Sequence, residues 1–309
     1  MPPTILFALQ APTLLNNFAQ IPEVWDVRYV KTHDVDFAEE ALLEVPEWDG
    51  TVPALFVGCG PHHEAWAAQH LPDVPSFTMI HTSDPEDMGG RQFGKHIIGM
   101  QRKGLDLASW HWKPRSTHFL SIAYEPKPVW SWSPDEPWGM MSRPQHRRPG
   151  TQARMKFLKD NLPYLSLYGQ DQPDGFLTGA ARAEVLANSS CYVSMVGPEA
   201  GVGLMEHEAM AAGIPVVARS WGDIESNMPD YPGLADTDEK LLALAIRCSW
   251  DRSFAEYVAE AGLRYIELYR TRESLVDSAT TLLAFAAARR REMLGILFSP
   301  EKGAGGRLP

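Results

Sequence analysis

A strand, a glycine-bearing turn, a helix, a second glycine and another strand follow one another between Cys191 and Ala218. Cys191 to Val196 is an apolar run, Leu204 to Ala212 has the composition of a helix, and Pro215 to Ala218 is the next apolar run. Successive strands joined through a helix pair in parallel, because the helix carries the chain back to the starting edge of the sheet. This stretch therefore predicts an α/β fold with helices on both faces of a parallel sheet.

The same alternation covers most of the chain. Short apolar runs stopped by glycine, proline or aspartate are typical of strands buried on both faces. The other expected strands are Ile5 to Leu9, Val27 to Val30, Ala54 to Val57, Phe77 to His81, His118 to Ala123, Trp138 to Ser142 and Tyr164 to Tyr168. The expected helices run from a cap at Thr151 to Lys159, from Ala180 to Ala187, and almost without interruption from Asp238 to Leu297.

A segment rich in proline and tryptophan, Lys127 to Gly150, separates two such regions. Proline blocks regular structure and stiffens connections, so this segment indicates a linker. A length of 309 residues is also that of about two domains. We therefore expect one domain over residues 1–132 and a second over residues 133–272.

Charge and cysteine content exclude several classes of protein. The formal net charge is −11, which gives no general attraction to nucleic acid or anionic membranes. The three cysteines lie far apart without a CxxC spacing, which argues against a disulfide framework or a structural zinc site. No apolar run approaches the roughly 20 residues that a membrane span needs. We expect a reduced, cytoplasmic protein without stable membrane insertion.

The glycine-bearing turn has the features of a phosphate site. Gly201 and Gly203 allow the backbone to approach a ligand closely. The first-turn amides of the helix that begins at Leu204 lack intrahelical partners and lie at the positive end of its dipole, which suits a diphosphate. Glu208 lies one turn further along, within reach of a sugar or ribose hydroxyl.

This stretch resembles the donor-binding segment of the retaining GT-B glycosyltransferases of the family 4-like type, also called glycosyl transferases group 1. The positions that match in place are Gly201, Gly203, Leu204, Glu208, Ala209, Met210, Ala211, Gly213, Pro215 and Val216. Gly139, Arg143, Arg148 and Gly150 are similar to the family's upstream phosphate-binding elements, and Gly222 and Glu225 to its downstream Gly-Gly-x-x-Glu.

Two positions depart from the family pattern. Ala200 stands where the family has the first glutamate of its pair, and Glu199 precedes that position by one residue. Arg148 replaces a lysine, so a planar fork takes the place of a point charge.

The resemblance implies an α/β protein of GT-B type, with two Rossmann-like domains facing across a cleft. It implies that the N-terminal domain binds the acceptor, that the C-terminal domain binds the nucleotide sugar, and that a final helix over residues 273–297 packs back on the N-terminal domain. The activity would be transfer of a sugar from a nucleotide-diphosphate donor to an acceptor hydroxyl with retention of configuration. No cofactor and no metal would be required.

The resemblance also suggests a role for each site residue. Arg143, Arg148 and the amides after Gly203 would hold the diphosphate, and Glu208 would bind the ribose. His81, at the end of an expected strand of the N-terminal domain, and Glu199 are the candidate catalytic residues, both directed at the donor sugar.

Three alternatives stay open. Basic and aromatic residues interleave in Trp110 to Arg115 and in Trp130 to Arg148, a pattern that makes DNA a possible acceptor, as in viral-type enzymes that glycosylate a hydroxymethylated base. A non-catalytic nucleotide-sugar-binding protein would tolerate the displaced Glu199. A sugar-phosphate epimerase is the third alternative, since one epimerase group shares the GT-B fold.

Overall fold

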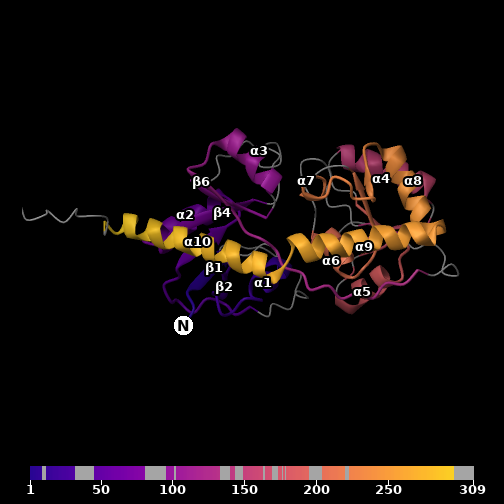
Figure 1. The fold of residues 1–309 in the computed structure, drawn as a ribbon. Coiled ribbons are helices and arrows are strands. Elements are labelled where there is room, and N and C mark those ends of the chain that lie inside the picture. Colours follow the sequence, from indigo (N-terminus) through magenta and orange to yellow (C-terminus); the bar gives the residue numbers. More distant parts are fainter. Residues whose placement is uncertain are drawn as a thin grey trace, which may run out of the picture.

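The computed structural model describes residues 1–8, 12–31, 45–80, 95–100, 102–132, 140–142, 149–162, 164–168, 173–175, 177, 179–194, 204–219 and 223–295. Two separate parallel sheets are formed, one in each lobe of the molecule seen in Figure 1. Every strand pairing within the two sheets is parallel, as the alternation of strands and helices predicts.

The first sheet has the strand order β2-β1-β3-β4-β5-β6. Its strands are β1 (Thr4–Ala8), β2 (Asp26–Val30), β3 (Leu55–Gly58), β4 (Ser76–Ile80), β5 (His96–Gly99) and β6 (Ser116–Phe119). The helices of this half are α1 (Pro12–Phe18), α2 (Pro61–His70) and α3 (Arg102–Trp112).

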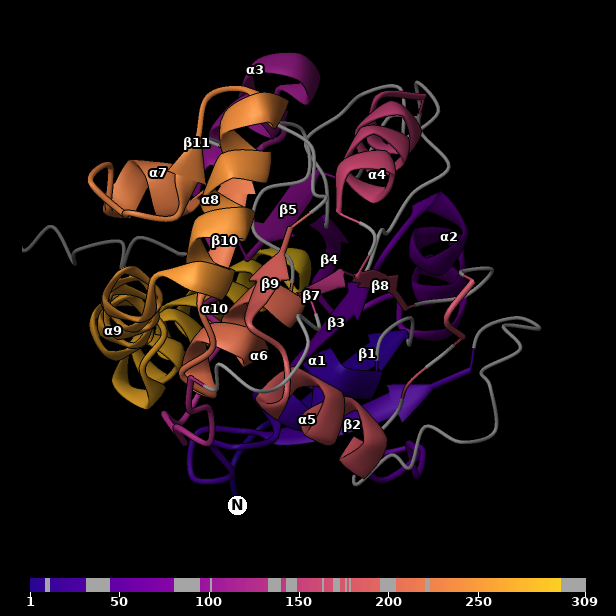
Figure 2. The ribbon, with the colours of Figure 1, turned by 90° about the vertical axis from the view of Figure 1, so that its right-hand side faces the viewer.

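The second sheet has the order β11-β10-β9-β7-β8. Its strands are β7 (Met140–Ser142), β8 (Leu165–Leu167), β9 (Cys191–Val193), β10 (Val216–Arg219) and β11 (Leu234–Ala235). The helices that follow β7 are α4 (Pro149–Asn161), α5 (Gly179–Ala187), α6 (Leu204–Ala211), α7 (Asp223–Asn227), α8 (Asp238–Trp250), α9 (Arg252–Tyr269) and α10 (Arg272–Met293). Figure 2 shows α5, α6 and α9 on one face of this sheet and α4 and α8 on the other.

The helical region after Asp238 is divided into three helices by its capping residues. The side chains of Thr237, Asp251 and Thr271 each accept a hydrogen bond from a backbone N–H in the first turn of α8, α9 and α10. Such caps satisfy N–H groups that a helix cannot pair internally, so each one fixes the start of a new helix.

The last helix packs on the first sheet although it follows α9 in sequence. Leu275, Ala279, Leu282 and Ala286 of α10 are buried in one cluster with Ile5 and Phe7 of β1. These four residues follow a spacing that places them on one face of a helix. In Figure 1, α9 lies along one lobe and α10 along the other. The predicted boundary between residues 132 and 133 adjoins residues 133–139, which lie outside the described part of the chain.

Several expected elements differ from the observed ones. The strand expected from His118 to Ala123 is β6, Ser116–Phe119, and the buried residues Leu120 to Ala123 lie beyond its end. The strands β5 and β11 were not expected. Thr151 is not a cap, because α4 begins at Pro149, where the fixed φ of proline suits a first helical turn. The glycine stop of α6 is confirmed, since Gly213 has a φ of +74°.

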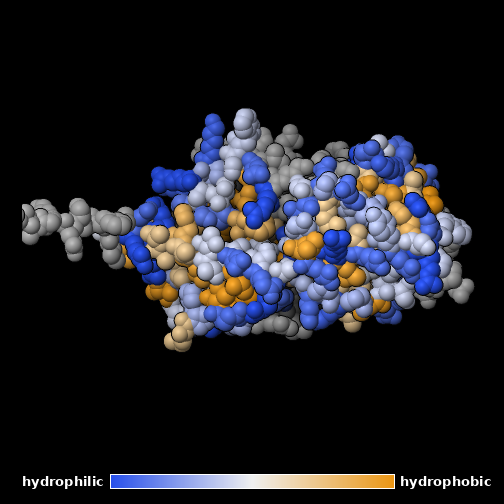
Figure 3. All heavy atoms as spheres, viewed as in Figure 1, coloured by the Kyte–Doolittle hydropathy of each residue, from blue (hydrophilic) through white to orange (hydrophobic). Residues whose placement is uncertain are grey.

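The surface in Figure 3 mixes hydrophilic and hydrophobic side chains, and the apolar patches on this face are small among its coloured residues. Trp110 of α3 is 79% exposed, whereas Trp130 and Trp132 are partly buried and pack against the core of the second half. Among the described residues, no helix combines the length and the apolar character that crossing a membrane would require.

Candidate donor-binding site

The first residue of α6 lies where the two halves of the molecule meet. Helix α6 follows β9, so it begins at the carboxyl edge of the second sheet, where α/β folds bind ligands. Leu204 packs against the core of the first half. Its carbonyl accepts a hydrogen bond of 3.5 Å from the hydroxyl of Tyr124, which belongs to the segment that joins the halves.

Glu208 forms an ion pair one turn into α6. Its Oε2 lies 3.2 Å from Nη2 of Arg182 on α5, and the side chains are 18% and 27% exposed. Both helices begin at the same edge and lie on the same face of the sheet (Figure 2). Glu208 is therefore neither a freely solvated acid nor a core residue, and a cation holds its carboxylate.

Tyr124 adds a neutral hydroxyl to this group. Burial raises the pKa of Tyr124, and the negative charge of Glu208 raises it further. The phenol thus keeps its proton and acts as a hydrogen-bond donor at the beginning of α6.

Glu206 and His207, which precede Glu208, point into the protein instead. Each is 1% exposed. Ser194 donates a hydrogen bond of 2.6 Å to Oε1 of Glu206. The His207 ring lies 5.8 Å from the ring of Tyr265, nearly parallel to it, and 5.5 Å from the ring of Tyr124. Burial, and then the positive charge of Arg270, lower the pKa of His207 well below its ordinary value, so its imidazole is neutral.

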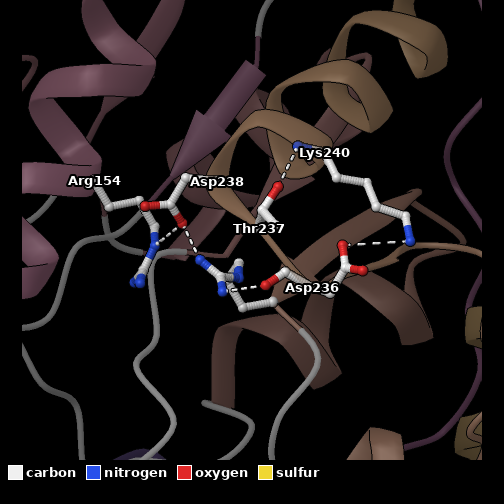
Figure 4. A network of polar contacts seen from close by, with 6 residues as sticks. Arg154, Asp236, Thr237, Asp238 and Lys240 are labelled. Atoms are coloured by element: carbon white, nitrogen blue, oxygen red, sulfur yellow. Dashed lines mark hydrogen bonds and ion pairs between the residues drawn. The ribbon is translucent and has the colours of Figure 1, made fainter.

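A second polar group gathers at the same edge on the other face of the sheet (Figure 4). Arg154 of α4 donates from Nε to Oδ1 of Asp238 at 2.8 Å, and Arg219 at the end of β10 donates to the same oxygen. Burial alone would raise the pKa of Asp238, but hydrogen bonds from the two arginines outweigh it, and the pKa lies below its ordinary value. Two guanidinium groups thus share one carboxylate oxygen at this end of the sheet.

Most of the sequence-predicted site residues lie outside the described part of the chain. These are His81, Arg143, Arg148, Glu199, Gly201 and Gly203. Leu204 and Glu208 are described, and α6 places them one turn apart. The assignments of all eight residues stay predictions.

Sequence reasoning missed three residues of this edge. Arg182 lies on α5, Arg219 on β10 and Tyr124 in the segment that joins the halves, and none is among the positions matched around Gly201. Arg219 has a visible signal, a charged residue at the end of an apolar run. Arg182 and Tyr124 have none, since only the fold brings them to α6.

Across the described ranges, no three histidine, cysteine, aspartate or glutamate side chains gather in an arrangement that would hold a metal ion.

Comparisons with known proteins identify the fold. No protein-family model matches the sequence, and no curated protein does either. Among solved structures, HepE from Anabaena, determined with UDP-glucose, is 14% identical with a TM-score of 0.62, over 96% of this chain and 100% of that one. Sucrose-phosphate synthase from Thermosynechococcus elongatus is 14% identical with a TM-score of 0.66, over 94% of this chain and 100% of that one.

A glycosyltransferase from Rickettsia africae ESF-5 gives 12% identity and a TM-score of 0.59, over 95% of this chain and 99% of that one. The likeness thus spans nearly the whole chain and includes both sheets. The chain has the GT-B fold of these glycosyltransferases, as the resemblance around Gly201 implies.

Proposed function

We propose that this chain is a glycosyltransferase that moves a sugar from a nucleotide-diphosphate donor to an acceptor hydroxyl. The observation that carries the proposal is the start of α6 at the carboxyl edge of the second sheet, directly after Gly201 and Gly203 in sequence and with Glu208 one turn further. The GT-B fold over nearly the whole chain supports it, as does the UDP-glucose bound to HepE, which has the same fold.

The transfer of the sugar suggests a role for each residue of the proposed site. The bond between the anomeric carbon and the β-phosphate oxygen breaks, the acceptor oxygen bonds to that carbon, and the acceptor proton leaves to a phosphate oxygen or to solvent. Negative charge builds on the departing diphosphate. Arg143, Arg148 and the amides after Gly203 would stabilise that charge. His81 and Glu199 would hold the donor sugar, and Glu208 the ribose.

We further propose that the reaction retains the anomeric configuration and needs no metal. Both parts follow from the resemblance of the segment around Gly201 to retaining family 4-like enzymes. Arginines close to the phosphates would replace the divalent cation, and Arg154 and Arg219, which share Asp238, place two guanidinium groups at this edge.

The acceptor is the part of the proposal with the fewest constraints. DNA with a hydroxymethylated base stays a candidate, and the exposed Trp110, close in sequence to Lys113 and Arg115, is the feature of the structure that favours it. The acidic net charge weighs against a nucleic-acid acceptor.

A thermal-shift screen of nucleotide sugars tests the proposed function, followed by donor hydrolysis without acceptor and acceptor trials that include hydroxymethylated DNA. We expect one nucleotide sugar to raise the Tm and to be hydrolysed slowly, in chelator as well as with Mg²⁺. Donor binding without hydrolysis or transfer would indicate the non-catalytic alternative, and an isomerised donor the epimerase. A chain that binds no nucleotide sugar would refute the proposal.

Glu208→Gln tests the ribose contact. The amide keeps the size of the side chain and loses its charge, so donor binding should weaken by about 1.5–3 kcal/mol, the range for hydrogen bonds to charged groups. Calorimetry with the nucleoside diphosphate measures this loss, and circular dichroism confirms that the variant folds. An unchanged Kd would remove Glu208 from the site.

A further inference from the structure

Arg182 is a cation that contacts Glu208, the residue proposed to bind the ribose. It is the fourth residue of α5, its Nη2 lies 3.2 Å from Oε2 of Glu208, and its side chain is 27% exposed. Both helices start at the carboxyl edge of the second sheet and lie on one face of it (Figure 2), so the pair joins two elements that flank the same end of the sheet.

The guanidinium group restricts the carboxylate that it contacts. A glutamate side chain has three rotatable bonds, and its terminal torsion is broad, so an unpaired carboxylate samples many orientations. A planar guanidinium group fixes the direction from which it is approached. The partial burial of both partners lowers the local dielectric, which strengthens the pair relative to one on the open surface.

The carboxylate also has enough acceptor capacity for both partners. An ionised carboxylate offers about four lone-pair positions on its two oxygens. The contact to Arg182 engages Oε2, and a carboxylate that pairs with a cation can still accept hydrogen bonds from ribose hydroxyls.

We propose that Arg182 is a positioning residue that orients the Glu208 carboxylate to read the 2′-hydroxyl of the donor, so that this site selects ribonucleotides over 2′-deoxyribonucleotides. The proposal rests on the proposed function and names the specificity of the same site. It does not require Arg182 to touch the donor.

The test compares two ligands that differ in a single hydroxyl. Calorimetry measures the Kd of UDP, GDP and ADP and of the 2′-deoxy form of each, for the wild-type chain of 309 residues and its variants. The variants are Arg182→Gln, which removes the cation, and Arg182→Lys, which keeps the charge without the fork. Arg252→Gln is the matched control, because Arg252 pairs with Glu256 on the exposed surface of α9.

We expect the wild-type chain to prefer one ribonucleotide over its deoxy form by roughly tenfold or more, the magnitude of one charge-assisted hydrogen bond. Arg182→Gln should lose most of that preference, because its Kd for the ribonucleotide rises while its Kd for the deoxy form changes little. Arg182→Lys should restore part of the preference, and Arg252→Gln should retain all of it. Melting curves show that each variant is folded at the temperature of the measurement.

Different failures have different meanings. If no nucleoside diphosphate binds the wild-type chain, the proposed function fails and the inference fails with it. If the wild-type chain binds and discriminates, and Arg182→Gln discriminates equally well, only the inference is wrong. If Arg182→Gln weakens the binding of the ribonucleotide and of its deoxy form equally, Arg182 is a phosphate ligand. If Arg182→Gln binds the ribonucleotide more tightly than the wild-type chain does, Arg182 competes with the ribose for Glu208. Either result overturns the positioning role.

Discussion

His207 is a single side chain whose environment predicts a gain in stability on substitution. Its ring is 1% exposed, and within the described residues neither ring nitrogen has a hydrogen-bond partner. A buried polar group without a partner costs about 1–3 kcal/mol. His207→Phe keeps the stacking on Tyr265 and removes the polar atoms, so the free energy of unfolding should rise by roughly 1 kcal/mol.

Urea unfolding of the wild-type chain and the variant measures this difference. His207→Ala serves as the control, because it removes the ring as well as the nitrogens and should destabilise by leaving a cavity. A loss of stability in His207→Phe would show that the imidazole has a polar partner in the folded chain.

The three polar residues from Glu206 to Glu208 show what a sequence reveals about a site and what it does not. The match to the family pattern selects Glu208, whose side chain is 18% exposed beside Arg182, and its assignment to the ribose stays a prediction. The spacing of apolar residues along α6, taken alone, does not separate Glu208 from Glu206 and His207, which are buried. Helix α6 is covered on several sides, so it lacks the simple apolar stripe that would mark its outer face.

The end of α3 carries a backbone conformation that favours glycine. Lys113 has a φ of +47°, and its N–H donates to the carbonyl of Ser109 at 3.2 Å, as in a left-handed helix stop. A residue with a Cβ pays about 1–2 kcal/mol for this conformation. Lys113→Gly should therefore raise the free energy of unfolding, by roughly 0.5–1 kcal/mol after the extra entropy of glycine in the unfolded chain is counted.

Thermal and urea unfolding measure the effect, with Lys113→Ala as the comparison. Alanine removes the same charge and keeps the Cβ, so it should give little or none of the gain. Equal effects of both substitutions would assign the change to charge and would exclude backbone strain as its cause.

At the scale of secondary-structure elements, the sequence predicts a strand well where an apolar run is bounded by polar or turn residues. It fails where the run is very short or where apolar residues continue beyond the end of the strand. The runs at β1, β3 and β10 are bounded by polar or turn residues and lie within a residue or so of their predicted positions. Strand β5 contributes only Ile97 and Ile98 as large apolar residues, too few to be recognised. The apolar run continues beyond β6 to Ala123. There the side-chain amide of Asn17 donates to the carbonyl of Ala123 and accepts from its N–H, so a side chain forms the hydrogen bonds that a neighbouring strand would form.

At the scale of the whole molecule, a buried and a partly buried histidine should make the fold sensitive to mild acid. His96 and His118 are linked through Ser116, with contacts of 2.8 Å and 2.7 Å to its hydroxyl. Burial, and then the charges of Arg289, His118, Arg115 and Lys95, lower the pKa of His96 to about 4, and burial lowers the pKa of His118. Both imidazoles are therefore neutral in the folded chain at neutral pH.

The direction of the pH dependence follows from these shifts. In the unfolded chain His96 takes up its proton near pH 6.5, while in the folded chain it does so only near pH 4. Stability is then fully present above about pH 6.5 and falls as the pH is lowered toward 4. Between pH 7.5 and pH 5.0, we expect His96 to lower the free energy of unfolding by about 2 kcal/mol.

Urea unfolding at the two pH values checks this. His96→Gln should reduce the difference, whereas the same substitution at the exposed His70 should leave it unchanged. If His96→Gln shows the same loss between the two pH values as the wild-type chain, His96 does not carry the acid sensitivity.

The two lobes depend on each other through the end of the chain. Residues from Leu275 to Ala286 complete the core of a sheet whose strands begin at Thr4, so the first half does not bury its apolar face with its own residues alone. No local pattern in the first half reveals this, because its missing partner lies more than a hundred residues away. Only the resemblance to a two-domain family indicated it. Substitutions in α10 should therefore destabilise the first half as strongly as substitutions within it.

Leu282→Ala tests this dependence. Leu282 is 1% exposed in the cluster that contains Ile5 and Phe7. Removing a buried leucine side chain costs about 2–5 kcal/mol, since the cavity adds to the lost burial. Leu294 provides the control, because it follows the last residue of the same helix and is 45% exposed. Leu294→Ala should lower the free energy of unfolding by less than about 0.5 kcal/mol. Urea unfolding followed by far-ultraviolet circular dichroism measures both, and hydrogen exchange locates the loss. A Leu282→Ala variant as stable as Leu294→Ala, or one whose exchange accelerates only in the second sheet, would show that α10 does not support the first sheet in solution.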